Sequence, residues 1–464
     1  MTTDMSAEEF RRYGHEVVDW IASYLENNRN LPVMPQTRPG ALEDALPGSA
    51  PEQGEPMEKI LEDFRRLVLP AVNHWNHPRF HAYFSVSASA PGILGEMLAA
   101  ALNTNGMLWL SSPANTELEM VVMRWLRQWI GLPEEFFGMI HDTASLSTMH
   151  AIAAARLAAE PGVREQGARP DLVVYTSEHA HSSVEKGALA LGMGRAQVRK
   201  IAADAVFRMR PDALQEAVRA DRAAGLRPCC VVSTVGTTAV TSIDPVAAVQ
   251  AIAEREKIWH HIDAAYGGPA AILPEMRWML AGADRADSLV VNPHKWLFTP
   301  IDLSAFYCRR PALLREAFSL VPSYLKTDQD PRAVNLMDYG VPLGRRFRAL
   351  KLWFVMRWFG RRGVEEILRA HLEWTRELAA AIEADERFEI CAPAPLSLIC
   401  FRLRGSDDAN RRLVERINAS GFAFLAGNTL GGRYMLRLAI GHVRTTREDV
   451  WAVWERLRAL ASRD

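Results

Sequence analysis

The sequence lacks the features of disulfide-rich, membrane-spanning and nucleic-acid-binding proteins. Its 464 residues contain only five cysteines, an odd number, with no C-x-x-C spacing, which argues against a disulfide scaffold. No stretch approaches the roughly 18 uninterrupted apolar residues of a transmembrane helix, and the start of the chain has no apolar core of a signal peptide. The formal net charge is −1, so no partnership with nucleic acid or an anionic membrane is expected. We expect a cytoplasmic protein with reduced thiols.

The composition that remains is that of a globular protein with more than one domain. Hydrophobic residues make up 48% and charged residues 23%, as in ordinary soluble proteins, and the chain is too long for one compact core. We predict an N-terminal helical segment over residues 1–85, a large domain over 86–360 and a small α+β domain over 361–464. Amphipathic helices at Ala7–Glu26 and Met57–Val72 have no core of their own, so they must pack on the rest of the protein or on a second subunit.

Short β-rich runs alternate with helical stretches in the middle of the chain. Such alternation predicts βαβ units and a mostly parallel sheet covered by helices, that is, an α/β fold. Ligands bind beyond the carboxyl ends of the strands in such sheets. Four runs have the pattern of buried strands: Asp171–Tyr175, Cys229–Val235, Lys257–Asp263 and Asp287–Asn292.

The residues at the ends of these four strands form a chemically coherent set. His181, Thr238 and Lys295 follow three of the strands, and Asp263 ends the other. A lysine amine forms a Schiff base with a carbonyl cofactor, and a carboxylate keeps a pyridine nitrogen protonated so that the ring accepts electrons. The hydroxyls and backbone amides of Asp142–Thr148, before a helical run, suit a phosphate. Together these groups meet the requirements of pyridoxal phosphate.

Each of these residues also has an ordinary structural interpretation. Lys295 alone resembles a solvated loop lysine, but its place after a buried strand favours catalysis. Asp263 resembles a helix cap, but the Ala-Ala-Tyr-Gly-Gly that follows it is no helix start. His181 is also placed to cap the helix expected at Ser182–Leu191, and this alternative stays open beside the role at the cofactor.

Three histidines invite a metal-site interpretation. His74, His77 and His81 have spacings that converge on one helix face. Pro78 interrupts such a helix, and no cysteine or acidic ligand joins them nearby, so no metal site is predicted.

Several motifs resemble those of one known family. The segment Asn292–Trp296 resembles the lysine box of the group II pyridoxal-phosphate decarboxylases, and the closest subgroup is that of the aromatic-L-amino-acid decarboxylases. The resemblance implies the aspartate-aminotransferase-like fold (fold type I), pyridoxal 5'-phosphate as cofactor and a homodimer with the active site at its interface. The other matching segments are Phe10–His15, Ser112–Pro113, Thr116–Glu119, His179–Glu185, Gly236–Thr238, Asp263–Tyr266 and Pro342–Phe347.

The resemblance also implies roles for single residues. Lys295 carries the cofactor, Asp263 pairs with the pyridine nitrogen, and His181 and Ala265 lie on opposite faces of the ring. Tyr324 lies in a segment that resembles the family's mobile catalytic loop, where a tyrosine returns a proton after carbon dioxide leaves. The remaining cofactor contacts that it implies are Thr143, Ala144, Ser145, Thr238, Ser288, Asn292 and His294.

The implied reaction is decarboxylation of an aromatic L-amino acid of the tryptophan, 5-hydroxytryptophan, tyrosine, DOPA or phenylalanine type. This chain departs from animal relatives at Val86, Asn105 and Met107, on the substrate side, so the preferred substrate stays open. Gly344 leaves space that plant relatives accepting indoles also leave. The implied substrate-binding residues are Trp75, Tyr83, Phe84, Val86, Asn105, Met107 and Gly344.

Three other functions are weighed against simple decarboxylation. An aromatic aldehyde synthase shares the scaffold, but its loop tyrosine is typically phenylalanine, so Tyr324 argues against it. An aminotransferase needs an arginine motif for the substrate carboxylate, which has no match here. A catalytically silent cofactor-binding protein is disfavoured by intact Lys295, Asp263 and His181.

Overall fold

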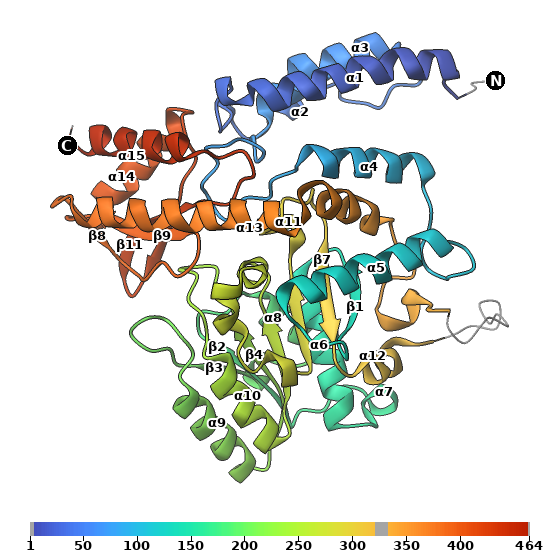
Figure 1. Cartoon of the computed structure of the whole chain (residues 1–464), viewed down its shortest axis with the longest axis vertical. Coiled ribbons are helices and arrows are strands. Elements are labelled where there is room, and N and C mark those ends of the chain that lie inside the picture. The colour runs from blue at the N-terminus through green and yellow to red at the C-terminus, as the bar shows by residue number, and fades with distance from the viewer. Residues whose placement is uncertain (1–3, 321–332, 463–464) are drawn as a thin grey trace.

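The computed structural model describes residues 4–320 and 333–462. The predicted proton donor Tyr324 lies outside these ranges. Within them the chain forms an N-terminal helical layer, a large α/β body and a small α+β unit (Figure 1).

Two helices of the N-terminal layer lie side by side along one edge of the molecule (Figure 1). They are α1 (Ala7–Asn27) and α3 (Met57–Asp63), with the short α2 (Ala41–Ala45) between them in sequence. Arg12 bonds to Glu58 across the pair at 3.0 Å. Neither α1 nor α3 buries any residue, although both carry apolar side chains. The predicted helices are confirmed, and the single chain leaves their apolar faces uncovered.

The large sheet has seven strands in the order β1-β7-β6-β5-β4-β2-β3. Pairing is parallel from β3 to β6, whereas β7 is antiparallel to both of its neighbours. The four predicted strands are β2, β4, β5 and β6, and the mostly parallel α/β sheet is confirmed. The bounds are β1 Phe137–His141, β2 Leu172–Ser177, β3 Val198–Ile201, β4 Arg227–Thr234, β5 Trp259–Asp263, β6 Ser288–Val291 and β7 Ser304–Cys308.

Helices cover both faces of this sheet because alternate side chains of its strands point to opposite sides. Val174 and Val232 pack with Ile152 of α6 on one face, whereas Val173 and Val231 belong to the core beneath α9 and α10 on the other. The helices of the large body are α4 Ala90–Leu102, α5 Pro113–Ile130, α6 Ala144–Ala159, α7 Val163–Gln166, α8 Ser183–Ala190, α9 Pro211–Ala223, α10 Val246–Glu256, α11 Pro293–Trp296 and α12 Pro311–Phe318.

The long helix α13 (Arg348–Glu383) joins the large body to the small one (Figure 1). Within it Gly360 has φ 61° and ψ 173°, a conformation that favours glycine. The predicted domain boundary falls at this break, and the three domain limits stay a prediction. The small unit has an antiparallel sheet in the order β10-β11-β9-β8, as the predicted α+β unit requires. Its elements are β8 Phe388–Ile390, β9 Leu398–Leu403, α14 Asp407–Ala419, β10 Ala426–Leu430, β11 Arg433–Ala439 and α15 Arg447–Ala461.

The structure has free cysteines, as the cysteine content predicts. All five cysteines are free and four are buried. Burial raises the pKa of Cys229, Cys308 and Cys400 to about 12, so these thiols are neutral packing groups. Within residues 4–320 and 333–462, no helix has the length and apolarity needed to cross a membrane.

Candidate active site

A cavity of about 230 Å³ lies at the carboxyl ends of β4, β5 and β6, against the start of α6. This is the edge at which the sequence predicted a ligand. The cavity brings together every predicted cofactor contact except Ser288. Its lining residues are Phe84, Thr143, Ala144, Ser145, His181, Thr234, Gly236, Thr238, Asp263, Ala265, Tyr266, Asn292, His294 and Lys295.

One end of this cavity suits an anion. Helix α6 begins after Thr143, whose Oγ1 accepts a hydrogen bond from Leu146 N at 3.4 Å. Ala144 and Ser145, in the first turn, line the cavity, and that turn contains no acidic side chain. Free backbone N–H groups and the helix dipole favour a phosphate there.

Lys295 and Asp263 face the same space from neighbouring strand ends. Burial lowers the pKa of the Lys295 amine, and the charge of Asp263 opposes part of that decrease. The amine therefore has a larger neutral, nucleophilic fraction than a solvated lysine. Asp263 is 5% exposed, and its Oδ1 accepts a hydrogen bond from Ala265 N at 3.1 Å. Within the described ranges no other hydrogen bond reaches this carboxylate, so an oxygen remains for a ligand.

Two histidines contribute neutral imidazoles. His181 lines the cavity, and its Nδ1 also accepts a hydrogen bond from Ser183 N at 3.2 Å. His181 therefore faces the cavity and also bonds to the start of α8, and its role at the cofactor stays a prediction. Burial lowers the pKa of His181 and brings that of His294 to about 3. His294 Nδ1 accepts from Leu303 N at 2.9 Å, so its proton resides on Nε2.

A larger, more open cavity of about 620 Å³ adjoins the first and shares Lys295 and His181 with it. Four predicted substrate residues line it: Trp75, Tyr83, Phe84 and Val86. The Trp75 and Tyr83 rings stack with centroids 5.6 Å apart, and Phe84 stacks on Tyr266 at 3.6 Å. An aromatic wall thus leads to the lysine, and it suits a flat apolar ligand.

Ser288 does not lie where the resemblance implied. It is the first residue of β6, whereas the cavity follows the last. Its hydroxyl oxygen lies 2.9 Å from both Trp259 Nε1 and His261 Nδ1. This corrects the expectation that Ser288 contacts the phosphate, because the length of the strand separates the two.

Three predicted substrate residues lie together but outside both cavities. Asn105 Oδ1 accepts a hydrogen bond from Arg345 N at 2.9 Å, beside Gly344, and Met107 packs against Met337 and Leu108. The single chain does not bring them to Lys295, and their role at the substrate stays a prediction. Arg345 itself is buried in an ion pair with Glu119, which gives it a structural role.

Some cavity residues escaped the sequence reasoning. Gly236 and Tyr266 lie inside motifs already recognised, and Thr234 is the last residue of β4, so the rule of strand ends identifies it. Asn76 and Ile301, which line the larger cavity, carried no signal in the sequence.

The three histidines considered for a metal take part in other contacts. His74 Nδ1 lies 3.0 Å from the Tyr24 hydroxyl, and His81 Nδ1 lies 2.8 Å from Ala439 O. Burial lowers the pKa of His77 to about 3. In the described ranges no group of three or more histidine, cysteine or acidic side chains is arranged to hold a metal ion.

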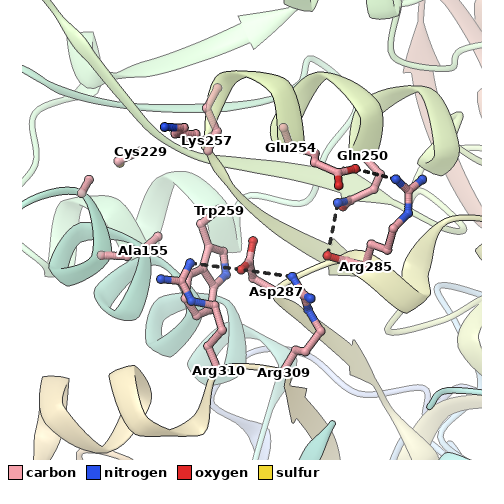
Figure 2. A pocket seen from close by; sticks show the side chains of 14 residues that line it. Ala155, Cys229, Gln250, Glu254, Lys257, Trp259, Arg285, Asp287, Arg309 and Arg310 are labelled. Carbon is pink, nitrogen blue, oxygen red and sulfur yellow. Dashed lines mark hydrogen bonds and ion pairs between the residues drawn. The ribbon is translucent and has the colours of Figure 1, made fainter. Parts of the chain in front are cut away.

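A further cavity, of about 430 Å³, lies at the opposite, amino end of the strands (Figure 2). Four basic side chains line it, and each of its two acidic side chains pairs with an arginine. Arg285 pairs with Glu254 at 2.5 Å and Arg310 with Asp287 at 3.3 Å, and the Arg310 guanidinium lies 5.3 Å from the centroid of the Trp259 ring. None of the predicted site residues lines it. The candidate active site is therefore the cavity at the carboxyl ends of the strands.

The fold and the lysine-containing cavity define a fold type I pyridoxal-phosphate enzyme. The family model for the pyridoxal-dependent decarboxylase conserved domain matches residues 39–404. The aromatic-L-amino-acid decarboxylase of Sus scrofa is 42% identical over 476 residues, covering 99% of this chain and 97% of the pig protein. The chain therefore belongs to the pyridoxal-dependent decarboxylase family.

Solved structures agree with this assignment. Catharanthus roseus tryptophan decarboxylase in complex with L-tryptophan has a TM-score of 0.94 at 36% identity, with 99% of each chain covered. The 4-hydroxyphenylacetaldehyde synthase of Rhodiola rosea has a TM-score of 0.92 at 34% identity, again covering 99% of each chain. The predicted family, fold type, cofactor and enzyme class, a carboxy-lyase, are confirmed. The residues present fit the cofactor: an amine, a carboxylate and an uncharged helix start face one cavity.

Proposed function

We propose that this enzyme decarboxylates an aromatic L-amino acid to the corresponding amine and carbon dioxide. The observation that carries the proposal is the aromatic wall of Trp75, Tyr83 and Phe84, which opens directly onto Lys295. A flat side chain of the substrate packs on that wall while its amino group reaches the lysine. The likeness to aromatic-L-amino-acid and tryptophan decarboxylases supports the same substrate class.

Each residue of the site has a defined task in this reaction. Bound pyridoxal phosphate supplies an electron-accepting ring for the electron pair that remains when the carboxylate leaves. Asp263 would hold a proton on the ring nitrogen, and Ala265 and His181, which line the same cavity, would contact the ring. The His181 imidazole would supply an N–H to the substrate. Lys295 supplies the amine that binds the cofactor and releases the product.

The aromatic wall orients the substrate and excludes water from the reacting carbon. Phe84 is buried, whereas Trp75 and Tyr83 are exposed in the single chain. An aromatic side chain that packs on these rings displaces water from the reacting carbon, which strengthens the electrostatic action of Asp263. Return of a proton by Tyr324 stays a prediction, because that residue lies outside the described ranges.

An aromatic aldehyde synthase is the second candidate, because the Rhodiola rosea structure shares the fold over nearly the full chain. That reaction consumes the amino acid, oxygen and water, and yields aldehyde, carbon dioxide, ammonia and hydrogen peroxide. The two functions differ in their products, so one assay separates them.

The test is product analysis of the purified enzyme with pyridoxal phosphate. The panel holds tryptophan, 5-hydroxytryptophan, tyrosine, DOPA, phenylalanine, histidine and glutamate. We expect amine and carbon dioxide in equal amounts from at least one aromatic member, and no turnover of glutamate. Aldehyde with peroxide would assign the synthase instead, and turnover of histidine or glutamate alone would exclude an aromatic substrate.

We also propose that the enzyme works as a cytoplasmic homodimer. The uncovered apolar surface supports a second subunit: Leu102 is 59% and Trp358 73% exposed, and Phe10 on α1 is 68% exposed. A partner that covers these faces also explains why Met107 and Gly344 lie outside their own chain's cavities. The free thiols support a reducing compartment.

Complementation tests this arrangement. If Met107 serves the partner's cavity, Lys295→Ala and Met107→Arg fall in the same site of a mixed dimer, which leaves the other site intact. We expect each variant alone to be inactive and the co-expressed pair to recover about a quarter of wild-type activity, since half of the dimers are mixed and each has one good site. Absence of any recovery from a folded mixed dimer would place Met107 in its own chain's site.

A further inference from the structure

A buried chain of hydrogen bonds runs from the backbone at Val341 to the cofactor cavity. Val341 N donates to His150 Nε2 at 3.1 Å, and His150 Nδ1 lies 3.1 Å from His141 Nε2. His141 Nδ1 lies 2.9 Å from Ser147 Oγ. The chain therefore crosses from a segment near the end of the large body to α6.

The cavity end of this chain is an asparagine. Ser147 Oγ lies 3.3 Å from Ser304 Oγ and also 3.3 Å from Thr143 O, a second acceptor for its proton. Ser304 Oγ donates to Asn292 Oδ1 at 2.7 Å. Asn292 lines the cavity beside Lys295. The side chains of His150, Ser147 and Ser304 are fully buried, and those of His141 and Asn292 nearly so, so water does not compete for these bonds.

The donor-to-acceptor direction of these hydrogen bonds follows from the first donor, Val341 N. A backbone N–H can only donate, so His150 Nε2 is an acceptor. Burial lowers the pKa of His150 to about 3 and that of His141 well below its usual value, so both rings are neutral near pH 7. His150 then carries its proton on Nδ1 and donates to His141 Nε2. His141 in turn carries its proton on Nδ1 and donates to Ser147.

The same direction sets the amide of Asn292. Its Oδ1 faces the Ser304 hydroxyl, so its NH₂ group points away from Ser304. Within the described part of the chain, that NH₂ group donates no hydrogen bond. A correctly turned amide therefore presents a donor to an anion in the cavity, whereas a turned-over amide would present an oxygen and repel it.

We propose that His150 and His141 are positioning residues for the cofactor's phosphate. The series of hydrogen bonds to which they belong holds the Asn292 amide with its NH₂ group toward the cavity. This rests on the proposed contact between Asn292 and the phosphate. Neither histidine lines the cavity, so neither touches substrate or cofactor. Their action passes through Ser147 and Ser304.

Gly340 offers a way to disturb the chain without removing any of its members. A Cβ at this glycine would lie 2.8 Å from His150 Cε1. Its φ of −169° is an extended conformation open to any residue, so alanine there disturbs the structure through the ring of His150. Gly340→Ala should therefore act in the same direction as His150→Leu.

The test compares two ligands that differ only in the phosphate. Apoenzyme is titrated with pyridoxal phosphate and with pyridoxal, following the absorbance of the lysine adduct. For Ser304→Ala, His141→Leu, His150→Leu and Gly340→Ala we expect Kd for pyridoxal phosphate to rise roughly tenfold, the loss of one hydrogen bond to a charged group. Kd for pyridoxal should change less than about twofold, since the phosphate contact is missing there.

His260→Leu is the matched control. His260 is a fully buried histidine of the same sheet with two side-chain partners, Ser233 Oγ at 2.7 Å and Gln250 Oε1 at 2.8 Å. We expect it to lower the melting temperature of the apoenzyme without changing the ratio of the two Kd values. Equal losses for both ligands in the chain variants, or the same change of ratio in His260→Leu, would overturn the proposal. Binding is measured without turnover. The two Kd values therefore test this proposal even if the enzyme does not catalyse the proposed reaction.

Discussion

Replacing Lys295 with alanine is expected to lower kcat at least about 10⁴-fold, as loss of a covalent catalytic group does in other enzymes. The amine lies at the junction of the two cavities, and burial lowers its pKa, which favours attack on a carbonyl. Without it the cofactor binds only through its phosphate and ring contacts. The visible absorbance of the lysine–cofactor Schiff base should disappear.

The measurement combines turnover, absorbance and mass. Borohydride reduction of the wild-type enzyme fixes the cofactor to its lysine, and we expect the added mass on the peptide that contains Lys295. Lys200→Ala is the control, since Lys200 on β3 pairs with Glu185 at 3.7 Å, away from the cavity residues. If Lys295→Ala kept a tenth of the activity, or the mass lay on another peptide, the assignment of the lysine would be wrong.

The strands that carry the site were predictable because they are buried on both faces. All residues of β2, β5 and β6 are buried, and such strands show as nearly continuous apolar and β-branched runs. The ends of these runs then locate His181, Asp263 and Lys295 by a topological rule alone.

The strands β1 and β7 were not predicted, because their extended form depends on contacts with segments that are distant in the sequence. They are short, contain Gly138 and Ser304, and owe their extended form to antiparallel pairing with each other and with β6. A pattern read along the chain contains no information on that pairing. Ser304 thus went unnoticed, although its hydroxyl holds Asn292.

Ser288 shows the opposite kind of error. The predicted strand already placed this serine at its beginning, so the rule of carboxyl ends argued against a cofactor contact. The direction of the strand, and not the resemblance, gives the correct place of Ser288. Met107 and Gly344 differ again, since one folded chain does not bring them to the cavity, and no local pattern predicts the position of the second subunit that we propose.

Replacing Asp263 with asparagine is the other change with a large expected effect, a fall in kcat of about 10³-fold. In the proposed function this carboxylate keeps the ring nitrogen of the cofactor protonated, and a protonated ring stabilises the negative charge that develops when carbon dioxide leaves. Asparagine has nearly the same shape and still accepts the hydrogen bond from Ala265 N, so folding and cofactor binding should change little. Single-turnover kinetics with the preferred substrate measure the chemical step directly.

Asp287→Asn is the matched control, because this carboxylate is also buried and lies at the amino end of the strands (Figure 2). We expect it to affect stability, with kcat per folded enzyme unchanged. A kcat for Asp263→Asn within tenfold of wild type would show that catalysis does not need the protonated ring.

A cofactor analogue separates the ring nitrogen from every other effect of Asp263. In an analogue with carbon in place of that nitrogen, no proton remains for the carboxylate to hold. Wild-type enzyme loaded with the analogue should be as slow as Asp263→Asn with pyridoxal phosphate, and combining the two changes should cost almost nothing more. Fully additive losses would mean that Asp263 acts through another group, since two changes that remove one interaction cannot both count in full.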